Sequence, residues 1–255
     1  MTEADIPAGL RLCRLSNWNQ LEADWKVFLC TRDGAGWVVE RQGEVVGTVA
    51  TLRYGGAFTW LSMMLVHPDS RRTGLGALLL ETALEALAGE RCVRLDATPL
   101  GEPLYRRFGF TGEFELVRAK ATLPAIPRPL QTTVHSVFDR DLRVFGADRS
   151  GLLASLRERS PEMAVSSPRG HCFGRPGYRY AQLGPVVADK EDTARELIGQ
   201  CAGGDVAIDF PRLHWKPWLA DLGFRIERPF LRMYRGEKPP GIPEQQFAIT
   251  GPEFG

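Results

Sequence analysis

The chain has 255 residues, which suits one large domain or two small ones. Hydrophobic residues make up 44% and charged residues 25% of the sequence, proportions typical of soluble globular proteins, and they exclude a wholly disordered chain. The 32 Lys and Arg residues nearly balance the 31 Asp and Glu residues, so the basic excess that is usual in nucleic-acid-binding proteins is absent.

Neither the first residues nor any apolar run predicts a targeting or membrane-spanning segment. The first nine residues contain Glu3, Asp5 and Pro7, which do not suit a signal peptide. No apolar run approaches the roughly 20 residues that a membrane helix needs. The cysteines form no C-x-x-C pair, and the histidines lack metal-ligand spacing. We therefore expect a reduced, cytoplasmic protein without a metal site, membrane contact or nucleic-acid partner.

The first half of the chain alternates predicted strands and helices. The patterns predict strands at Leu10–Leu15, Trp37–Arg41, Glu44–Leu52, Phe58–Val66 and Val93–Asp96. They predict helices at Asn17–Leu29, from Leu75 to Leu87, and at Leu100–Phe108. The dipeptide Gln42-Gly43 predicts a tight hairpin turn. The nearly continuous apolar run Phe58–Val66 is typical of a central strand that is covered on both faces.

A proline-rich segment separates the two halves. Pro124, Pro127 and Pro129 favour an extended connector, and a new helical stretch is predicted from Asp139 to Arg159. We therefore divide the chain into domains 1–125 and 126–255.

A weak internal repeat links the two halves. The segments Val93–Pro99 and Pro103–Phe110 have counterparts at Val206–Pro211 and Pro217–Phe224, shifted by 113 residues at Val206 and by 114 at Phe224. Chance similarity of two strand–helix units is the alternative. Two copies of one architecture explain the pattern better.

The loop before the helix that starts near Leu75 has the features of a pyrophosphate site. Arg71, Arg72 and Thr73 offer cationic and hydroxyl donors. Gly74 and Gly76 lack side chains, so backbone amides can approach an anion closely. The start of a helix adds unpaired N–H groups and a partial positive charge. The spacing matches neither a P-loop nor a dinucleotide fingerprint.

These residues resemble a known family. Arg71-x-x-Gly74-x-Gly76 resembles the R/Q-x-x-G-x-G/A motif of the GCN5-related N-acetyltransferases (GNAT). The preceding Val66-His67-Pro68 and the later Leu104–Phe110 resemble that family's fourth strand and its C-terminal motif. The resemblance covers most of the first half and implies an α/β fold with a mixed central sheet.

The second half resembles a bacterial subgroup with a second, degenerate GNAT-like domain. The similarity lies in Leu183–Ala188, in the repeated strand–helix unit and in the terminal Phe247–Gly255. The segment after Val187 has no glycine and three acidic side chains, which repel pyrophosphate, and Leu219 stands where the first half has Tyr105. The resemblance thus implies tandem GNAT-like domains, of which the second does not bind the cofactor.

The family resemblance implies acetyl transfer from acetyl-CoA to a primary amine in a ternary complex. Tyr105 matches the tyrosine that many members place near the sulfur, where a phenol can protonate the departing thiolate. Backbone groups of the fourth strand would bind the pantetheine arm and polarise the thioester carbonyl. The implied cofactor-binding residues are Met64, Leu65 and Val66 on the strand, and Arg71, Arg72, Thr73, Gly74, Leu75, Gly76 and Ala77 in the loop and helix.

The sequence departs from the family pattern at two positions. Thr98 replaces the asparagine that many members have seven residues before the tyrosine, although it can still donate a hydrogen bond to the cofactor. Val93 replaces the glutamate base of enzymes that acetylate ribosomal-protein N-termini, which weakens that interpretation. Asp96 is the candidate base. Its counterpart Asp209 in the second half favours a structural role as the alternative.

Two classes of function remain open. One is acetyl-CoA-dependent N-acetylation of a small-molecule amine, with the second domain covering the substrate cleft. The other is a non-catalytic acyl-CoA sensor or scaffold, and a protein lysine substrate also stays open. Tyr105 favours an enzyme, because a binding protein needs no acid at the sulfur. The apolar Phe247, Ile249 and Phe254 predict that the C-terminal segment docks onto the body, and its reaching the active site is a further hypothesis.

Overall fold

The computed structural model describes residues 1–124, 135–201, 203–214 and 216–255. In the first half the elements are α1 (Ile6–Leu15), α2 (Glu22–Leu29), β1 (Gly34–Arg41), β2 (Glu44–Tyr54), β3 (Phe58–Val66), α3 (Leu75–Ala86), β4 (Cys92–Ala97), α4 (Glu102–Arg107) and β5 (Thr111–Leu123). In the second half they are α5 (His135–Phe145), α6 (Ser150–Arg159), β6 (Ala164–Ser167), β7 (Gly170–Arg175), β8 (Ala181–Ala188), α7 (Glu191–Cys201), β9 (Gly204–Pro211), α8 (Pro217–Asp221), β10 (Arg225–Gly236) and β11 (Gln246–Ala248).

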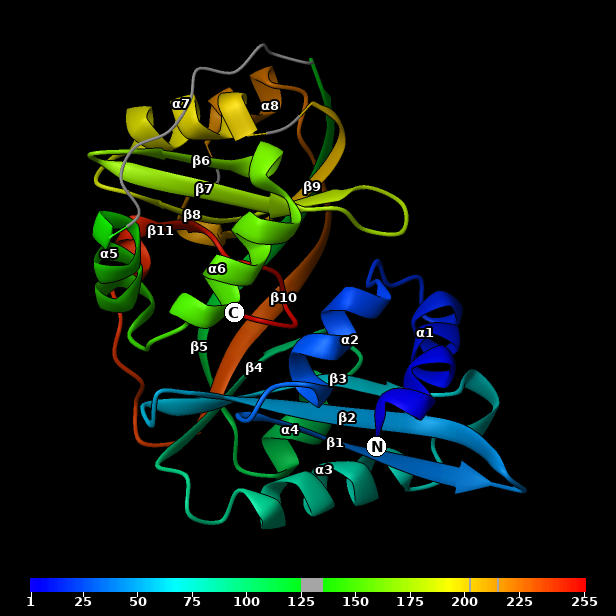
Figure 1. The fold of residues 1–255 in the computed structure, drawn as a ribbon. Coiled ribbons are helices and arrows are strands. Elements are labelled where there is room, and N and C mark those ends of the chain that lie inside the picture. Colours follow the sequence, from blue (N-terminus) through cyan, green and yellow to red (C-terminus); the bar gives the residue numbers. More distant parts are fainter. Residues whose placement is uncertain (125–134, 202, 215) are drawn as a thin grey trace.

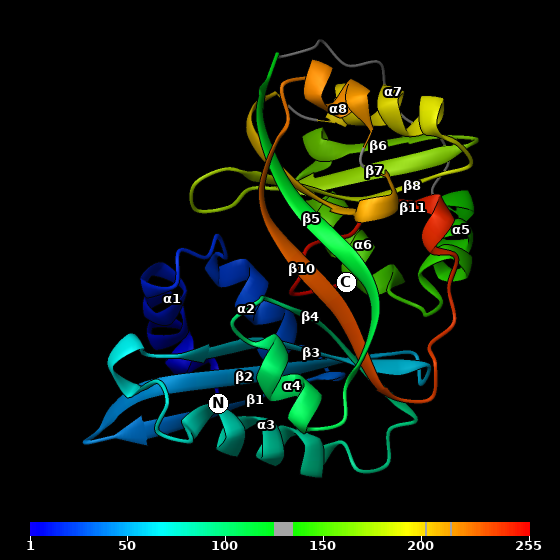
Figure 2. The same ribbon diagram turned by 180° about the vertical axis from the view of Figure 1, so that it is seen from behind.

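The described strands form one sheet whose order is symmetric about its centre. The order is β1-β2-β3-β4-β10-β5-β9-β8-β7-β6, and β11 pairs with β8. The two long strands β5 and β10 pair with each other and join the halves (Figures 1 and 2). Each also pairs with a strand of the other half, β10 with β4 and β5 with β9. The halves have therefore exchanged their last long strands across the centre of the sheet.

This symmetry supports the repeat that the sequence indicated. Strand β4 corresponds to β9, and helices α3 and α4 correspond to α7 and α8 in order and position (Figure 1). The proposed domain boundary at 125/126 lies outside the described residues. Because β10 is inserted between β4 and β5, the ranges 1–125 and 126–255 follow the repeat but share a single sheet.

Three of the predicted elements differ in the structure. The predicted strand Leu10–Leu15 is the end of helix α1, because Ile6, Leu12 and Cys13 are buried together on one helical face. The helix predicted from Asn17 starts only at Glu22, since Asn17 has a left-handed backbone with φ of 57°. The stretch 139–159 is divided between α5 and α6 at Gly146, whose φ is 88°.

Other predictions are confirmed closely. Gln42 and Gly43 have φ values of 53° and 80°, as a two-residue hairpin turn of type I′ requires, and they connect β1 to β2. The apolar run Phe58–Val66 is strand β3, with a strand on each side. It is buried because helices cover both faces of this part of the sheet, α1 and α2 on one and α3 on the other (Figure 1).

A shared hydrophobic core holds the halves together. One cluster of buried side chains includes Trp25 and Phe28 from α2, Trp60 from β3, Leu153 from α6 and Phe254 near the C-terminal end of the sequence. These residues come from both halves, so each half completes the core of the other. In the part of the chain that the structure describes, no helix has both the length and the apolar character needed to span a membrane.

Candidate active site

A cleft opens where two parallel strands of the first half diverge. Strands β3 and β4 pair only at Thr59 with Val93 and at Trp60 with Arg94. Beyond these pairs β4 continues along β10, while β3 stays paired with β2 on its other side. The backbone of Leu61–Val66 thus presents to β4 an edge that has no ladder partner among the described strands. Unpaired strand edges are ready to bind an extended ligand.

A bulge interrupts β3 at this cleft. Ser62 pairs with Ala50 and Leu65 with Thr48, so two residues, Met63 and Met64, lie opposite one residue of β2. Met63 has a φ of 51°, which is unusual for a residue inside a strand, and the Thr48 hydroxyl donates a 2.7 Å hydrogen bond to its carbonyl. Bulges bend a strand and redirect its backbone groups, often beside active sites. No pattern in the sequence predicted this bulge.

The loop after β3 leads to a helix start that is open to an anion. Gly74 has a φ of 89° and precedes α3; no side chain caps the helix, and its first turn has no acidic residue. Arg71 donates to the Val66 carbonyl at 3.1 Å, and the Thr73 hydroxyl donates to the Ser70 carbonyl at 2.7 Å. These two side chains brace the loop. The free amides of the first turn then suit a pyrophosphate.

The two glycines of the motif differ in the space beside them. A Cβ built on Gly74 would meet nothing within 4 Å, and on Gly76 its nearest contact would be Leu104 at 3.5 Å. The space beside Gly74 is therefore available to a ligand, whereas the Cβ direction of Gly76 points toward apolar side chains at ordinary contact distance. Arg72, with a φ of 61°, is exposed in the loop just before Gly74. The chemistry of this donor set fits the phosphates of acetyl-CoA.

Tyr105 projects from α4 into the same cleft. Its side chain is buried and packs edge-on against Phe110, with ring centroids 5.8 Å apart. No described residue forms a hydrogen bond with its hydroxyl, which leaves that group for a ligand. Burial raises the pKa of Tyr105, so the phenol keeps its proton at neutral pH. The nearby Thr98 hydroxyl accepts a hydrogen bond from the Gly101 N–H at 3.2 Å and so supports the start of α4.

Asp96 does not have the geometry of a free base. Both of its oxygens accept hydrogen bonds from Arg232 at 2.8 and 2.9 Å, and neither side chain is exposed to solvent. Burial raises the pKa of Asp96, although the charge of Arg232 opposes this shift. Its counterpart Asp209 binds Arg118 in the same way, at 2.9 and 2.8 Å. Each pair joins a strand of one half to the strand exchanged from the other, which supports the structural alternative for Asp96.

The pocket at the cleft is lined by residues from widely separated parts of the chain. The predicted residues Met64, Asp96, Thr98 and Tyr105 are among them. Most of the other lining residues could not be predicted from the sequence, because strand exchange and the crossing C-terminal segment bring them to the pocket. The pocket lining consists of Trp18, Gln20, Leu61, Ser62, Met63, Met64, Asp96, Thr98, Tyr105, Arg118, Arg228, Phe230, Pro252 and Glu253.

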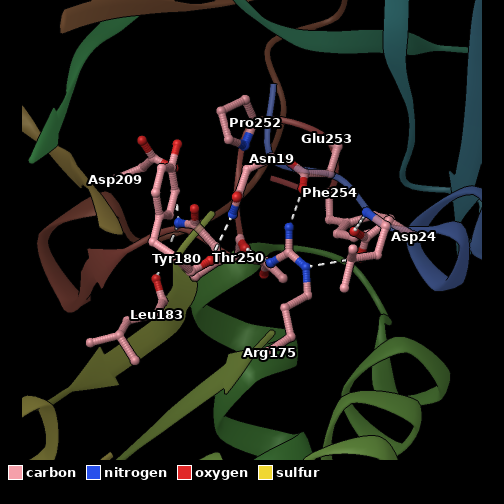
Figure 3. Close-up of polar contacts among 12 residues, drawn as sticks. Asn19, Asp24, Arg175, Tyr180, Leu183, Asp209, Thr250, Pro252, Glu253 and Phe254 are labelled. Atoms are coloured by element: carbon pink, nitrogen blue, oxygen red, sulfur yellow. Dashed lines mark hydrogen bonds and ion pairs between the residues drawn. The ribbon is translucent and has the colours of Figure 1, made fainter. Parts of the chain in front are cut away.

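The C-terminal segment crosses between the halves and reaches this pocket. The Phe254 ring stacks on Phe28 with centroids 5.3 Å apart, and Trp60 Nε1 donates to the Pro252 carbonyl at 3.0 Å. Arg175 lies between Asp24 and Glu253 and binds both carboxylates (Figure 3). The docking that the apolar residues predicted is therefore present, and the segment contributes Pro252 and Glu253 to the pocket.

The matching cleft of the second half is closed by the chain itself. Strands β8 and β9 also pair in parallel only over Ala181–Leu183. Beyond that point β11 pairs with β8, and the Ile249 N–H donates to the Asp209 carbonyl at 3.0 Å. The following helix, α7, has Glu191 and Asp192 in its first turn. The backbone of 246–249 thus occupies the position that stays open in the first half, so this half has no room for a cofactor.

This closure depends on one glycine. Gly184 has a φ of 138°, and a Cβ placed on it would meet the Ile249 carbonyl oxygen at 1.8 Å. We expect Gly184→Ala to displace β11 and to lower the free energy of unfolding by about 2 kcal/mol or more. Gly199→Ala is the matched control, because it lies in α7 with open space around it and should stabilise the helix slightly. Equal melting temperatures for the two variants would contradict this account.

Comparison with known proteins decides the family. Two models, both described as an acetyltransferase (GNAT) domain, match residues 32–112 and 137–248. The chain belongs to the GNAT acetyltransferases. It is a tandem GNAT protein, since the two matches correspond to the two halves of the sheet and together span most of the chain. Family membership makes it an N-acetyltransferase, and acetyl-CoA is the acetyl donor that GNAT acetyltransferases use.

Individual relatives agree with this tandem GNAT assignment. The uncharacterized N-acetyltransferase YitH of Bacillus subtilis is 23% identical over 93% of this chain and 91% of its own length. A Pyrococcus horikoshii protein with a proposed acetyltransferase assignment superposes with a TM-score of 0.84 at 20% identity, covering 100% of this chain and 94% of the other. A tandem GNAT protein from the clavulanic acid biosynthesis pathway gives a TM-score of 0.62 at 17% identity, covering 94% and 98%. These structural similarities establish the fold.

Proposed function

We propose that this GNAT protein transfers an acetyl group from acetyl-CoA to the primary amine of a small molecule. The observation that carries the proposal is the continuous path in the first half. It runs from the uncapped start of α3, along the unpaired edge of β3, to the pocket that holds Tyr105. The second half has lost the equivalent path, so one active site per chain follows.

In this proposal each part of the path has its own task. The amides from Arg72 to Ala77 bind the pyrophosphate, and the edge of β3 at Met64, Leu65 and Val66 binds the pantetheine arm and polarises the thioester carbonyl. Acetyl-CoA supplies the activated acetyl group. The amine nitrogen forms a bond to the acetyl carbon, and the carbon–sulfur bond breaks. The sulfur takes a proton from Tyr105, the amine gives up its proton to water, and the Tyr105 phenolate then takes a proton back from water.

The shape of the pocket supports a small acceptor. Its lining combines the α1–α2 connection, through Trp18, with Arg228 and Phe230 of the exchanged strand and Pro252 of the C-terminal segment. The second half and this segment therefore border the acceptor side of the cleft. A polypeptide lysine would need an open groove at this place, which favours a small molecule as the substrate.

Gly76→Glu tests the cofactor site. The backbone of Gly76 has no positive φ, and a Cβ there would make only ordinary van der Waals contacts, the nearest with Leu104 at 3.5 Å, so a glutamate should be tolerated by the fold while its carboxylate repels pyrophosphate. Acetyl-CoA at about 100 times its Kd should stabilise the wild type by about 2.7 kcal/mol, seen as a higher melting temperature. We expect no such rise in the variant.

Gly151→Glu is a closely matched control. It also lies at the second residue of a helix, α6, with no neighbour within 4 Å of its Cβ. This variant should keep the full acetyl-CoA response. A wild type that melts cooperatively but does not respond to acetyl-CoA, or a Gly76→Glu variant that still responds, would overturn the proposed cofactor site.

A further inference from the structure

The pocket contains one guanidinium group with no carboxylate partner among the described residues. Arg228, on the exchanged strand β10, lines the pocket with its side chain half-buried, and its Nε atom is buried without a hydrogen-bond partner. No described residue forms an ion pair with it. Burying an unpaired charge costs free energy, so such a group is expected where a ligand of opposite charge completes the site.

The carboxylates closest to Arg228 are already engaged. Its charge interacts with those of Asp209 and Glu227, but Asp209 binds Arg118 through both oxygens and Glu227 binds Lys120. The adjacent Arg118 adds a second positive charge. Both guanidinium groups lie over the ring of Phe230, with Cζ atoms 5.4 Å (Arg118) and 4.9 Å (Arg228) from its centroid. The Phe230 ring thus contacts Arg228 without neutralising it, and the nearby positive charge of Arg118 repels it.

The same pocket offers separate groups for an amine. Glu253 contributes a carboxylate to the pocket. Arg175 binds this carboxylate but also binds that of Asp24, so its charge is shared between the two (Figure 3). Gln20 lines the pocket with a buried side-chain oxygen that has no hydrogen-bond partner in the structure. The pocket therefore combines acceptors suited to an ammonium or amine group with a donor suited to an anion.

Arg228 is also distinct from the proposed phosphate site. None of the residues from Arg71 to Ala77 lines the pocket, whereas Trp18 and Gln20 from the opposite side of the sheet do. The phosphates of acetyl-CoA have their own donors at the start of α3. The unpaired guanidinium thus faces the part of the cleft left for the acceptor.

We propose that the acceptor amine also carries a carboxylate, as amino acids do, and that Arg228 binds this carboxylate. This inference rests on the proposed acetyl transfer and names the substrate class. A carboxylate is favoured over a phosphate because Asp96 and Glu253 line the pocket and Asp209 binds the lining residue Arg118, so a dianion would meet stronger repulsion than a monoanion. Arginine binds a carboxylate through two parallel hydrogen bonds, which also fixes the orientation of the amine.

The test compares matched amines with and without a carboxylate. Release of the CoA thiol is followed with L-lysine, L-phenylalanine and β-alanine, and with cadaverine, phenethylamine and ethylamine, which lack only the carboxylate. The wild type should prefer at least one amino acid over its matched amine by about 10- to 100-fold in kcat/KM, the effect of a hydrogen-bonded charge. In Arg228→Gln this preference should disappear through a higher KM for the amino acid, with the KM for acetyl-CoA unchanged.

Arg225→Gln is the control, because Arg225 is exposed on the same strand and does not line the pocket. It should retain the preference in full. Preference for the carboxylate-free amines, or an unchanged ratio in Arg228→Gln, would overturn the inference. A protein that responds to acetyl-CoA but acetylates neither set would also overturn it, while leaving the cofactor site intact. Failure of acetyl-CoA to bind would instead overturn the proposed function itself.

Discussion

Asp96→Ala is expected to lower the free energy of unfolding by about 3–5 kcal/mol, the usual cost of leaving one charge of a buried ion pair without its partner. Arg232 would remain fully buried beside the rings of Trp60 and Phe114. The nearby carboxylate of Glu113 already binds Arg94. At about 2–4 °C per kcal/mol, the melting temperature should fall by roughly 10 °C or more. Chemical denaturation and thermal melting both measure this loss.

The double variant Asp96→Leu/Arg232→Met separates the structural role from a catalytic one. Replacing a whole buried pair with apolar side chains of similar volume is often neutral, so this variant should melt near the wild type. If Asp96 only holds the exchanged strand, the double variant, with its core repacked, should recover most of the acetyl-transfer rate that Asp96→Ala loses. A stable double variant that has lost turnover would show that the carboxylate itself takes part in the reaction, contrary to our interpretation.

The local parts of the fold could be predicted because local sequence determines them. The hairpin at Gln42-Gly43 needs left-handed residues, and the helix after Gly74 follows from its apolar spacing. The start of the chain could not be predicted in this way. Leu10–Leu15 is a short segment whose apolar spacing is compatible with a strand or with a helix, and only its packing against α2 and the sheet makes it helical.

The candidate site likewise contains residues that local sequence predicts and residues that only the tertiary fold brings in. The anion-binding loop and Tyr105 lie in one stretch of the chain, from the end of β3 to α4, so local motifs predict them. Arg228, Pro252 and Glu253 come from segments more than 120 residues downstream of Tyr105, brought in by strand exchange and by the crossing C-terminal segment. No local pattern encodes that geometry. The repeat did carry one useful signal, because Asp209 in a half without a cofactor cleft already pointed to a structural role for Asp96.

Tyr105→Phe is expected to lower kcat for acetyl transfer by about 10²- to 10⁴-fold, the typical contribution of a general acid. The reason is that the raised pKa keeps the phenol protonated, and its hydroxyl forms no hydrogen bond with any described residue. Loss of the oxygen should therefore leave the melting temperature and the acetyl-CoA response nearly unchanged. The measurement is the single-turnover rate with an amine that the wild type acetylates.

Tyr54→Phe is the control: it makes the same tyrosine-to-phenylalanine change, but it should lower stability and leave the rate of acetyl transfer nearly unchanged. The buried Tyr54 hydroxyl donates to the Phe254 carbonyl at 2.8 Å, so its removal should cost about 1 kcal/mol of stability. Because Tyr54 does not line the pocket, its effect on the chemical step should be small. If Tyr105→Phe instead lost stability and kept the wild-type rate, Tyr105 would be a core residue, and the proton for the departing sulfur would have to come from another group.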